Sequence, residues 1–158
     1  MELLKTIPGV GEGIALGIIS EIGVDMEQFP SHKQLSSWAG VSPGNNESAG
    51  KNRSGKITQG NKWLKTKLVE AGWSAFHSKD TYLQSKYRSL VRRKGPKKAI
   101  IALGHKILIS AYHMIKNKKS YKELGNSYLD NSRKENLINF YKHQLSKLEP
   151  VADSFSLA

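Results

Sequence analysis

"KKAIIALGHKILISAYHMIK", residues 97–116, is the most apolar stretch of the chain, and the rest of the fold has to pack around it. Its apolar run, 99–115, is interrupted by two histidines, a lysine and a serine, and no run in the sequence is long and apolar enough to span a bilayer. We therefore expect residues 97–116 to form a long central helix.

The segments on both sides of this helix also carry helical signals. In "NKWLKTKLVEAGWSAFHS", residues 61–78, apolar side chains recur at helical spacing while lysines fall off that stripe. "SHKQLSSWAG" has Ser31 as a predicted N-cap and Gly40 just past its end. Besides the central helix, the expected helices cover residues 2–6, 14–23, 31–40, 61–78, 80–94 and 131–148.

No segment has a convincing strand pattern, and no internal repeat is present. The predicted fold class is therefore all-α, a compact helical domain. We expect the main domain over residues 1–130 and a C-terminal helix and tail over 131–158, with 150–158 frayed.

The composition points to a polyanionic partner. The chain has 158 residues, and 25 Lys and Arg against 13 Asp and Glu give a net charge of +12. Such an excess favours nucleic acid over a membrane surface. There is no cysteine, and Met1 is followed by an acid rather than a secretory signal. We expect a cytoplasmic protein.

"LLKTIPGVGEGIALGIISEIG", residues 3–23, fits a helix-hairpin-helix. Glycines let the backbone turn tightly, and the unpaired N–H groups of the second helix would then face a DNA phosphate. The alternative is a plain turn between two core helices. On the first interpretation the nucleic-acid contacts of this segment are Gly9, Gly11 and Gly13.

"PGNNESAGKNRSGKITQGN", residues 43–61, follows neither a helical nor a strand period, and we expect a long loop. Part of it, "GKNRSGKI", resembles a nucleotide-binding P-loop, but Ile57 replaces the Ser or Thr and no strand is predicted before it, so we reject that interpretation. Two alternatives stay open: a flexible linker, or a functional loop whose serine is a nucleophile. Glu47 adjoins Ser48 in sequence, yet no activating base is evident.

A second basic cluster follows, with no acid from its first to its last member. Such a cluster indicates a salt-dependent phosphate-binding surface rather than a merely solvated helix face. It consists of Lys86, Arg88, Arg92, Arg93, Lys94, Lys97 and Lys98.

The remaining aromatic and titratable residues give weaker signals. We expect Trp63, Trp73 and Tyr112 in the core and Trp38 beside the loop. The five histidines are scattered, which favours structural or surface roles, and no group of acids is placed to hold Mg²⁺. No cofactor site is expected in this chain.

Taken in order, these motifs resemble one family. The glycine-rich serine loop with its "GN" at Gly60 and Asn61, the helix-hairpin-helix before it and "RRKGPKKAI" (92–100) after it are similar to the C-terminal domain of the insertion-sequence one-ten, one-sixteen and nine-oh-two transposases, the bridge-RNA-guided DNA recombinases. The resemblance covers residues 2–130.

The resemblance implies a mechanism and partners. A serine of this domain would attack a DNA phosphodiester and hold the strand as a phosphoserine, while an N-terminal RuvC-like domain would supply Mg²⁺. That domain is absent from this sequence, so we expect the chain alone to bind nucleic acid without recombining it. The expected partners are DNA and a guide RNA, with homo-oligomers in the full-length protein.

Carried over by residue, the catalytic serine is Ser48, with Ser54 as second choice. Two other functions stay open: a non-catalytic helix-hairpin-helix nucleic-acid-binding module, and an RNA-binding accessory protein. The remaining expected nucleic-acid contacts are Lys51, Arg53, Lys56, Asn61, Lys62, Arg92, Arg93, Lys94, Lys97 and Lys98.

Overall fold

The structure is a computed structural model that describes the backbone of residues 1–43, 46–48, 51–54 and 57–155, and the side chains of residues 1–43 and 57–147. Helices dominate it, which confirms the predicted all-α class. The elements are α1 Glu2–Lys5, α2 Glu12–Ile22, the 3-10 helix η1 Met26–Gln28, α3 His32–Trp38, β1 Asn46–Ser48, β2 Lys51–Ser54, α4 Lys62–His77, α5 Tyr82–Lys94, α6 Pro96–Asn117 and α7 Tyr128–Phe155.

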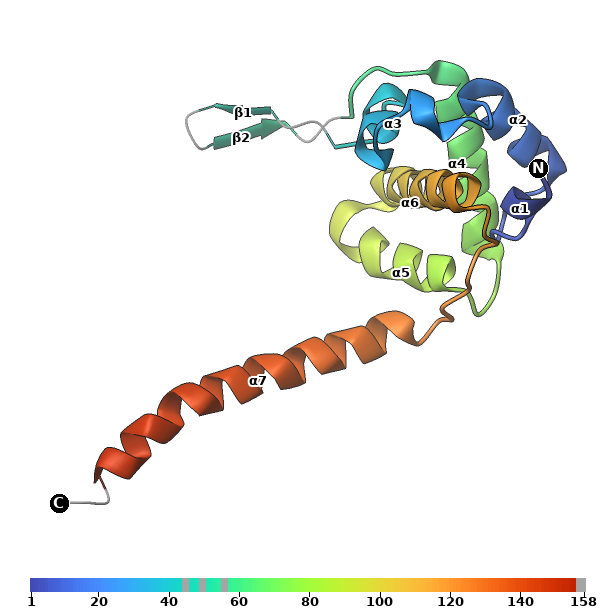
Figure 1. The fold of residues 1–158 in the computed structure, drawn as a ribbon. Helices are drawn as coiled ribbons and strands as arrows, with labels where there is room; N and C mark the ends of the chain where they lie inside the picture. The colour runs from blue at the N-terminus through green and yellow to red at the C-terminus, as the bar shows by residue number, and fades with distance from the viewer. Residues whose placement is uncertain (44–45, 49–50, 55–56, 156–158) are drawn as a thin grey trace.

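The helix α6 is the centre of the fold, as its sequence predicts. It contacts α1, α3, α4, α5 and η1, so most of the body packs around it (Figure 1). Leu103, Ile107 and Leu108 on α6 are fully buried. Removing these apolar side chains from water is the main stabilising contribution to such a core.

Two glycines let α4 and α6 approach closely. A Cβ added at Gly104 would lie 2.8 Å from the Leu68 carbonyl oxygen, and one at Gly72 would lie 3.0 Å from the Ile100 carbonyl oxygen. Any larger residue would push the two helices apart, so the sequence fixes the crossing of this pair of helices.

The helix ends follow ordinary capping chemistry. Ser31 and Thr81 accept hydrogen bonds from backbone N–H groups in the first turns of α3 and α5. Gly23 ends α2 with φ 68° and Gly95 ends α5 with φ 77°, a backbone conformation that glycine adopts without steric cost. These ends agree with the boundaries expected from the sequence within a few residues.

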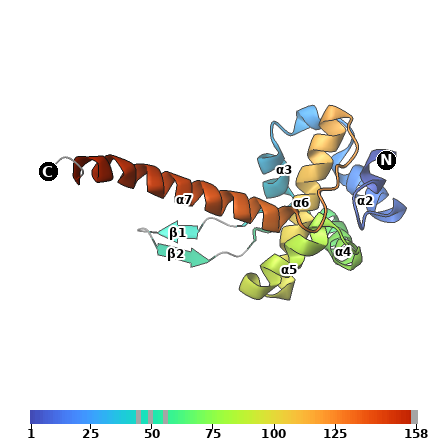
Figure 2. The ribbon, with the colours of Figure 1, turned by 90° about the horizontal axis from the view of Figure 1, so that it is seen from below.

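The expectation of a structureless loop at 43–61 is wrong in part. β1 and β2 pair as an antiparallel hairpin that projects from the helical body (Figures 1 and 2). A bridge between Pro43 and Ile57 continues this pairing towards the body. The sequence hides the hairpin because its strands are short and polar, and backbone pairing rather than apolar alternation holds them.

The last helix also differs from its prediction. α7 begins at Tyr128, extends into the segment expected to fray and ends at Phe155. It leaves the body near α5, the element it contacts (Figures 1 and 2). In the part of the chain that the structure describes, every helix is too short or too polar to cross a membrane.

Candidate nucleic-acid interface

The predicted nucleophile lies at the outer end of the hairpin. Ser48 is the last residue of β1, and the register pairs it with Lys51, the first residue of β2. Ser54, the second choice, pairs with Asn46 at the end nearer the Pro43–Ile57 bridge. Asn46, the partner of Ser54, is two positions before Ser48 on β1, so the two serines stand about 7 Å apart along the ribbon.

The hairpin contains a bulge beside these residues. Glu47 pairs with Asn52 and Asn46 pairs with Ser54, so the register skips Arg53. An extra residue of this kind bends a strand and is frequent beside functional sites. Lys56, also expected to contact nucleic acid, lies outside the described residues.

The base of the hairpin is closed by two glycines. A Cβ at Gly60 would overlap the Gly40 backbone, and one at Gly40 would lie 2.7 Å from the Gly60 nitrogen. Beside them the Asn61 N–H donates to the Trp38 carbonyl oxygen over 3.2 Å. The two ends of the segment that carries the hairpin are therefore held together at α3 and α4.

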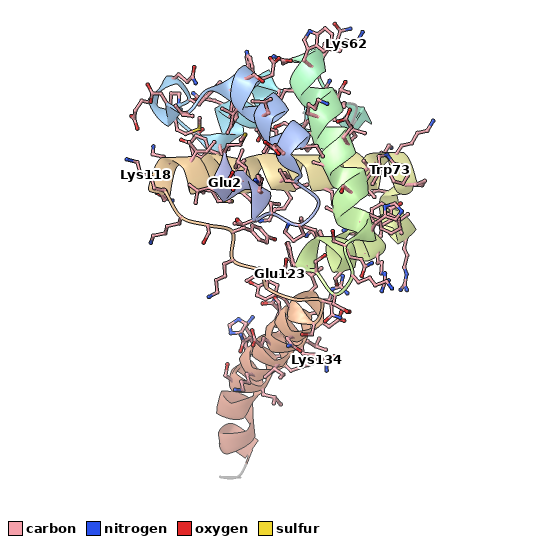
Figure 3. All side chains as sticks on the ribbon, turned by 90° about the vertical axis from the view of Figure 1, so that its right-hand side faces the viewer. Glu2, Lys62, Trp73, Lys118, Glu123 and Lys134 are labelled. Carbon is pink, nitrogen blue, oxygen red and sulfur yellow. The ribbon has the colours of Figure 1, made fainter. Side chains whose placement is uncertain are left out.

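The Asn61 side chain stabilises the base of the hairpin through two hydrogen bonds. Its side-chain oxygen accepts from the Leu64 N–H over 2.9 Å and caps α4, while Nδ2 donates to a Glu21 carboxylate oxygen over 2.6 Å. Both ends of the amide are thus engaged within the fold. Its contact with nucleic acid stays a prediction, and so does that of Lys62, which is exposed at the start of α4 (Figure 3).

The three glycines of the N-terminal turn are not equivalent. Gly9 has φ 85°, and a Cβ there would overlap the backbone of Ala75 on α4, so packing alone explains a glycine at this position. Gly11 and Gly13 meet nothing within 4 Å and remain open. Glu12 already places a negative charge in the first turn of α2, where a phosphate was expected.

The helix α6 begins in a different electrostatic setting. Its first turn holds Lys97 and Lys98 and no acid, and its N-cap Gly95 has no side chain to satisfy the free N–H groups. The N-terminus of a helix carries a partial positive charge, and Lys97 and Lys98 add to it, so this end of α6 favours the binding of an anion. The last turn of α5 adds the exposed cations Arg92, Arg93 and Lys94.

Lys86, on α5, belongs to the same basic cluster, and its pKa is lowered. Burial lowers the pKa of the Lys86 ammonium first, and the neighbouring cations Lys106, Arg93, Arg133 and Lys94 lower it further. Arg133 comes from α7 and was not among the residues the sequence singled out. No local signal marks it, because it reaches the cluster only through the placement of α7.

Two tryptophans predicted to lie in the core are exposed instead. Trp63 is 75% exposed and Trp73 is 46% exposed, and Figure 3 shows Trp73 pointing out from α4. Helical spacing with Leu64 and Leu68 predicts a core position for Trp63, and apolar character predicts one for Trp73, but both lie outside the buried stripe of α4. Tyr112 is buried as expected and donates its hydroxyl to the Phe29 carbonyl oxygen over 3.0 Å.

The histidines do not form a metal site among the described residues. His32 and His113 lie with ring centroids 5.1 Å apart, a contact between α3 and α6 that the sequence did not reveal. Burial is the first cause that lowers the pKa of both His105 and His113, followed by the charge of His32. Within the same described part of the chain, no three His, Cys, Asp or Glu side chains are grouped to hold a metal ion.

Comparison of the sequence with known proteins places this chain among transposases. A sequence model of the family described as "Transposase IS116/IS110/IS902 family" matches residues 1–88, which include the N-terminal turn and the hairpin. The chain is 30% identical over 125 residues to the "Putative transposase y4pF/y4sB" of Sinorhizobium fredii, covering 76% of this chain and 32% of that protein.

A second relative gives a similar result. The chain is 27% identical over 123 residues to the "Transposase for insertion sequence element IS1111A" of Coxiella burnetii, covering 75% of this chain and 34% of that protein. The chain thus spans about a third of the length of these two relatives.

Proposed function

The chain belongs to the IS116/IS110/IS902 transposase family, and we propose that it is the DNA-binding, nucleophile-bearing part of such a transposase. Ser48 is the proposed nucleophile. The observation that carries the proposal is the position of Ser48 at the outer end of a hairpin that projects from the body, paired with a lysine. A residue there is able to reach a DNA strand without the helical body colliding with it.

The proposed reaction is a transesterification at phosphorus. The Ser48 hydroxyl oxygen forms a bond to the phosphorus of a DNA phosphodiester, and the bond from that phosphorus to one strand end breaks. The serine proton finishes on the leaving oxygen, directly or through water. The phosphoserine is itself a phosphodiester of the DNA strand. A hydroxyl group at a second strand end can therefore displace the serine without an external energy source.

The residues around Ser48 suit the charge that develops in this step. Lys51 is its partner in the register, and Arg53 occupies the bulge of the same ribbon. Cations beside a transferring phosphoryl group stabilise its transition state. The proposal assigns this chain the nucleophile and the binding of the DNA backbone.

The basic ends of α5 and α6 complete the proposed interface with nucleic acid. Arg92, Arg93 and Lys94 lie in one helix end, and Lys97 and Lys98 begin the next. Their contacts would go to phosphates and carry no base information. From the family resemblance, the proposal also includes a guide RNA as the source of sequence choice and homo-oligomers of a longer protein as the assembly.

The second candidate function is a non-catalytic nucleic-acid-binding module. It is favoured by the open backbone at Gly11 and Gly13 and by the net charge of +12, neither of which requires chemistry at Ser48. It predicts sequence-indifferent, salt-dependent binding in which Ser48→Ala has no effect in any assay.

Covalent trapping separates the two functions. A longer transposase that contains this chain is incubated with a nicked DNA substrate, denatured and examined for a protein–DNA adduct. We expect an adduct from the wild-type protein, none from Ser48→Ala, and an adduct from Ser54→Ala.

Binding is measured in parallel on the same variants. Ser48→Ala should bind DNA as the wild type does, because a hydroxyl at the ribbon's end contributes little to phosphate affinity. Loss of DNA binding in Ser48→Ala, or loss of the adduct in Ser54→Ala alone, would show that Ser48 is not the nucleophile.

A further inference from the structure

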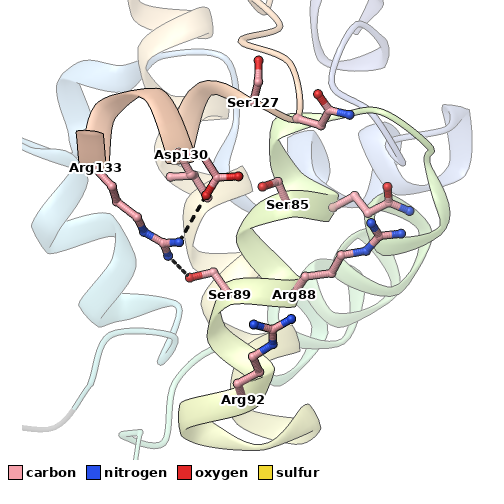
Figure 4. Close-up of a pocket in the computed structure, with 10 residues that line it drawn as sticks. Ser85, Arg88, Ser89, Arg92, Ser127, Asp130 and Arg133 are labelled. Atoms are coloured by element: carbon pink, nitrogen blue, oxygen red, sulfur yellow. Dashed lines mark hydrogen bonds and ion pairs between the residues drawn. The ribbon is translucent and has the colours of Figure 1, made fainter. Parts of the chain in front are cut away.

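A groove of about 410 Å³ lies between α5 and the beginning of α7, away from the hairpin (Figure 4). The α5 wall holds Ser85, Arg88, Ser89 and Arg92. The α7 wall holds Asp130 and Arg133. These two segments are far apart in the sequence, and only the packing of α7 on α5 forms the groove.

The spacing on α5 explains why Ser85, Arg88, Ser89 and Arg92 share a face. Residues separated by three, four and seven positions lie along one side of an α-helix. The opposite side of α5 carries Leu83, Tyr87 and Leu90, which are buried in the core. One helix therefore anchors itself with its apolar side and presents hydroxyl and guanidinium groups with the other.

Arg133 is held across the groove. Its Nη2 donates to the Ser89 hydroxyl over 2.6 Å, and its Nη1 donates to the Asp130 carboxylate over 3.3 Å (Figure 4). A guanidinium has five N–H groups, and these bonds use two of them. The group is thus oriented by the fold and still able to donate to a ligand.

The other two arginines come from α5. Arg88 and Arg92 line the groove together with Arg133, as the close-up in Figure 4 shows. Among the described side chains neither has an acidic group within ion-pair distance, while Asp130 is the groove's acid. Three guanidinium groups and one carboxylate line the groove.

We propose that this groove binds the phosphodiester backbone of a nucleic acid, with Arg88, Arg92 and Arg133 as its phosphate contacts. Guanidinium groups match phosphate oxygens in bidentate geometry, and serine hydroxyls add further donors. The inference rests on the proposed nucleic-acid function and extends the proposed contact surface from Arg92 at the end of α5 to Arg133 on α7.

The lining argues against a small-molecule pocket. Such pockets are mostly apolar with a few polar groups. Here Leu129 is the apolar residue of a lining that otherwise carries hydroxyl, amide, carboxylate and guanidinium groups. A backbone strand needs only the polar groups, since its bases remain outside the groove.

The test compares salt dependence of binding in matched variants of the whole chain. Affinity for a short mixed-sequence duplex DNA and for a single-stranded RNA is measured over a range of salt concentrations. The groove variant is Arg88→Gln with Arg133→Gln. The control is Lys142→Gln with Lys147→Gln, which removes the same charge from exposed positions farther along α7.

We expect the groove variant to lower affinity about tenfold and the slope of log K against log salt by about 2, with the control nearly unchanged. Arg88→Lys should retain the slope because the charge remains. Arg88→Gln alone leaves both Arg133 bonds intact, so it must show about half of the effect even if the double variant loosens α7. The ligand with the larger loss identifies the strand that the groove takes.

Two results would overturn the inference. The first affects the groove assignment alone, and the second also affects the proposed function. If the wild type binds with a steep salt slope but Arg88→Gln and the groove variant match the control, the groove is not a backbone site and the proposed function is untouched. If the wild type shows no salt-dependent binding to either nucleic acid, the proposed function fails, and the groove assignment fails with it.

Discussion

The Asn61 side-chain amide donates to the Glu21 carboxylate over 2.6 Å, which joins the start of α4 to α2 directly below the hairpin. The two residues are 40 positions apart in the sequence. Because the same amide caps α4, one residue fixes both where the helix begins and how it sits against α2. The hairpin segment between Gly40 and Gly60 is therefore attached to the body where α4 is fixed against α2.

Removing the Asn61 amide should destabilise the protein. Asn61→Ala loses the cap and leaves the half-buried Glu21 carboxylate without its donor, so we expect the free energy of unfolding to fall by about 2 kcal/mol. Urea denaturation followed by circular dichroism measures the change. Lys62→Ala is the control, because its exposed side chain should shift stability by less than about 0.5 kcal/mol. Equal stability of the two variants would contradict the structural role of Asn61.

Gly60→Ala should open the base of the hairpin. An added Cβ would overlap the Gly40 backbone, and backbone atoms cannot move aside as the end of a side chain does. We expect a loss of about 1–3 kcal/mol in the free energy of unfolding, measured by denaturant titration. In Gly11→Ala the new methyl group meets nothing within 4 Å, so that variant is the matched control. A Gly60→Ala variant as stable as Gly11→Ala would show that the two ends are not in contact.

Alanine substitutions at two neighbouring residues at the start of α4 should differ sharply in how much they lower the free energy of unfolding. Trp63 is 75% exposed and Leu64 is fully buried. Leu64→Ala should reduce the free energy of unfolding by about 2–5 kcal/mol, while Trp63→Ala should change it by less than about 0.5 kcal/mol. Thermal unfolding of both variants gives the comparison. A large loss of stability in Trp63→Ala would restore the core position expected from the sequence.

Stability should decline on mild acidification because of His105. Its pKa in the folded chain is lowered from the ordinary 6.5, chiefly by burial, so the unfolded chain binds the proton more readily. The contribution of His105 is therefore fully present above about pH 6.5 and is lost as the pH falls below that value. Denaturant titrations between about pH 7.5 and pH 5 measure it.

The matching variant is His105→Gln, which should reduce this pH dependence. It will not abolish it, since burial also lowers the pKa of His113. His143→Gln serves as control, because His143 is exposed on α7. An unchanged pH dependence in His105→Gln would assign the effect to other groups.

The helices were predictable because their signals are local. The apolar stripe of 97–116 and the helix end before Gly40 depend on residues a few positions apart, and the structure confirms them. The hairpin was missed because its stability lies in backbone pairing between segments rich in glycine and polar residues. The exposure of Trp63 could not be predicted because the apolar character of a side chain does not show whether it faces the core or the solvent.

By itself, the sequence determined a basic, helical protein with a central helix and a long polar insertion at 43–61, since composition and short-range periodicity set these features. The motifs in their order also indicated the family, and the family comparison confirms it. Only the tertiary structure decided that Ser48 pairs with Lys51 at the outer end of a ribbon, that Asn61 holds Glu21, and that Arg133 reaches Ser89. The physical reason is that each of the last two relationships joins residues more than one element apart, and such contacts arise from how helices pack rather than from any signal at either residue.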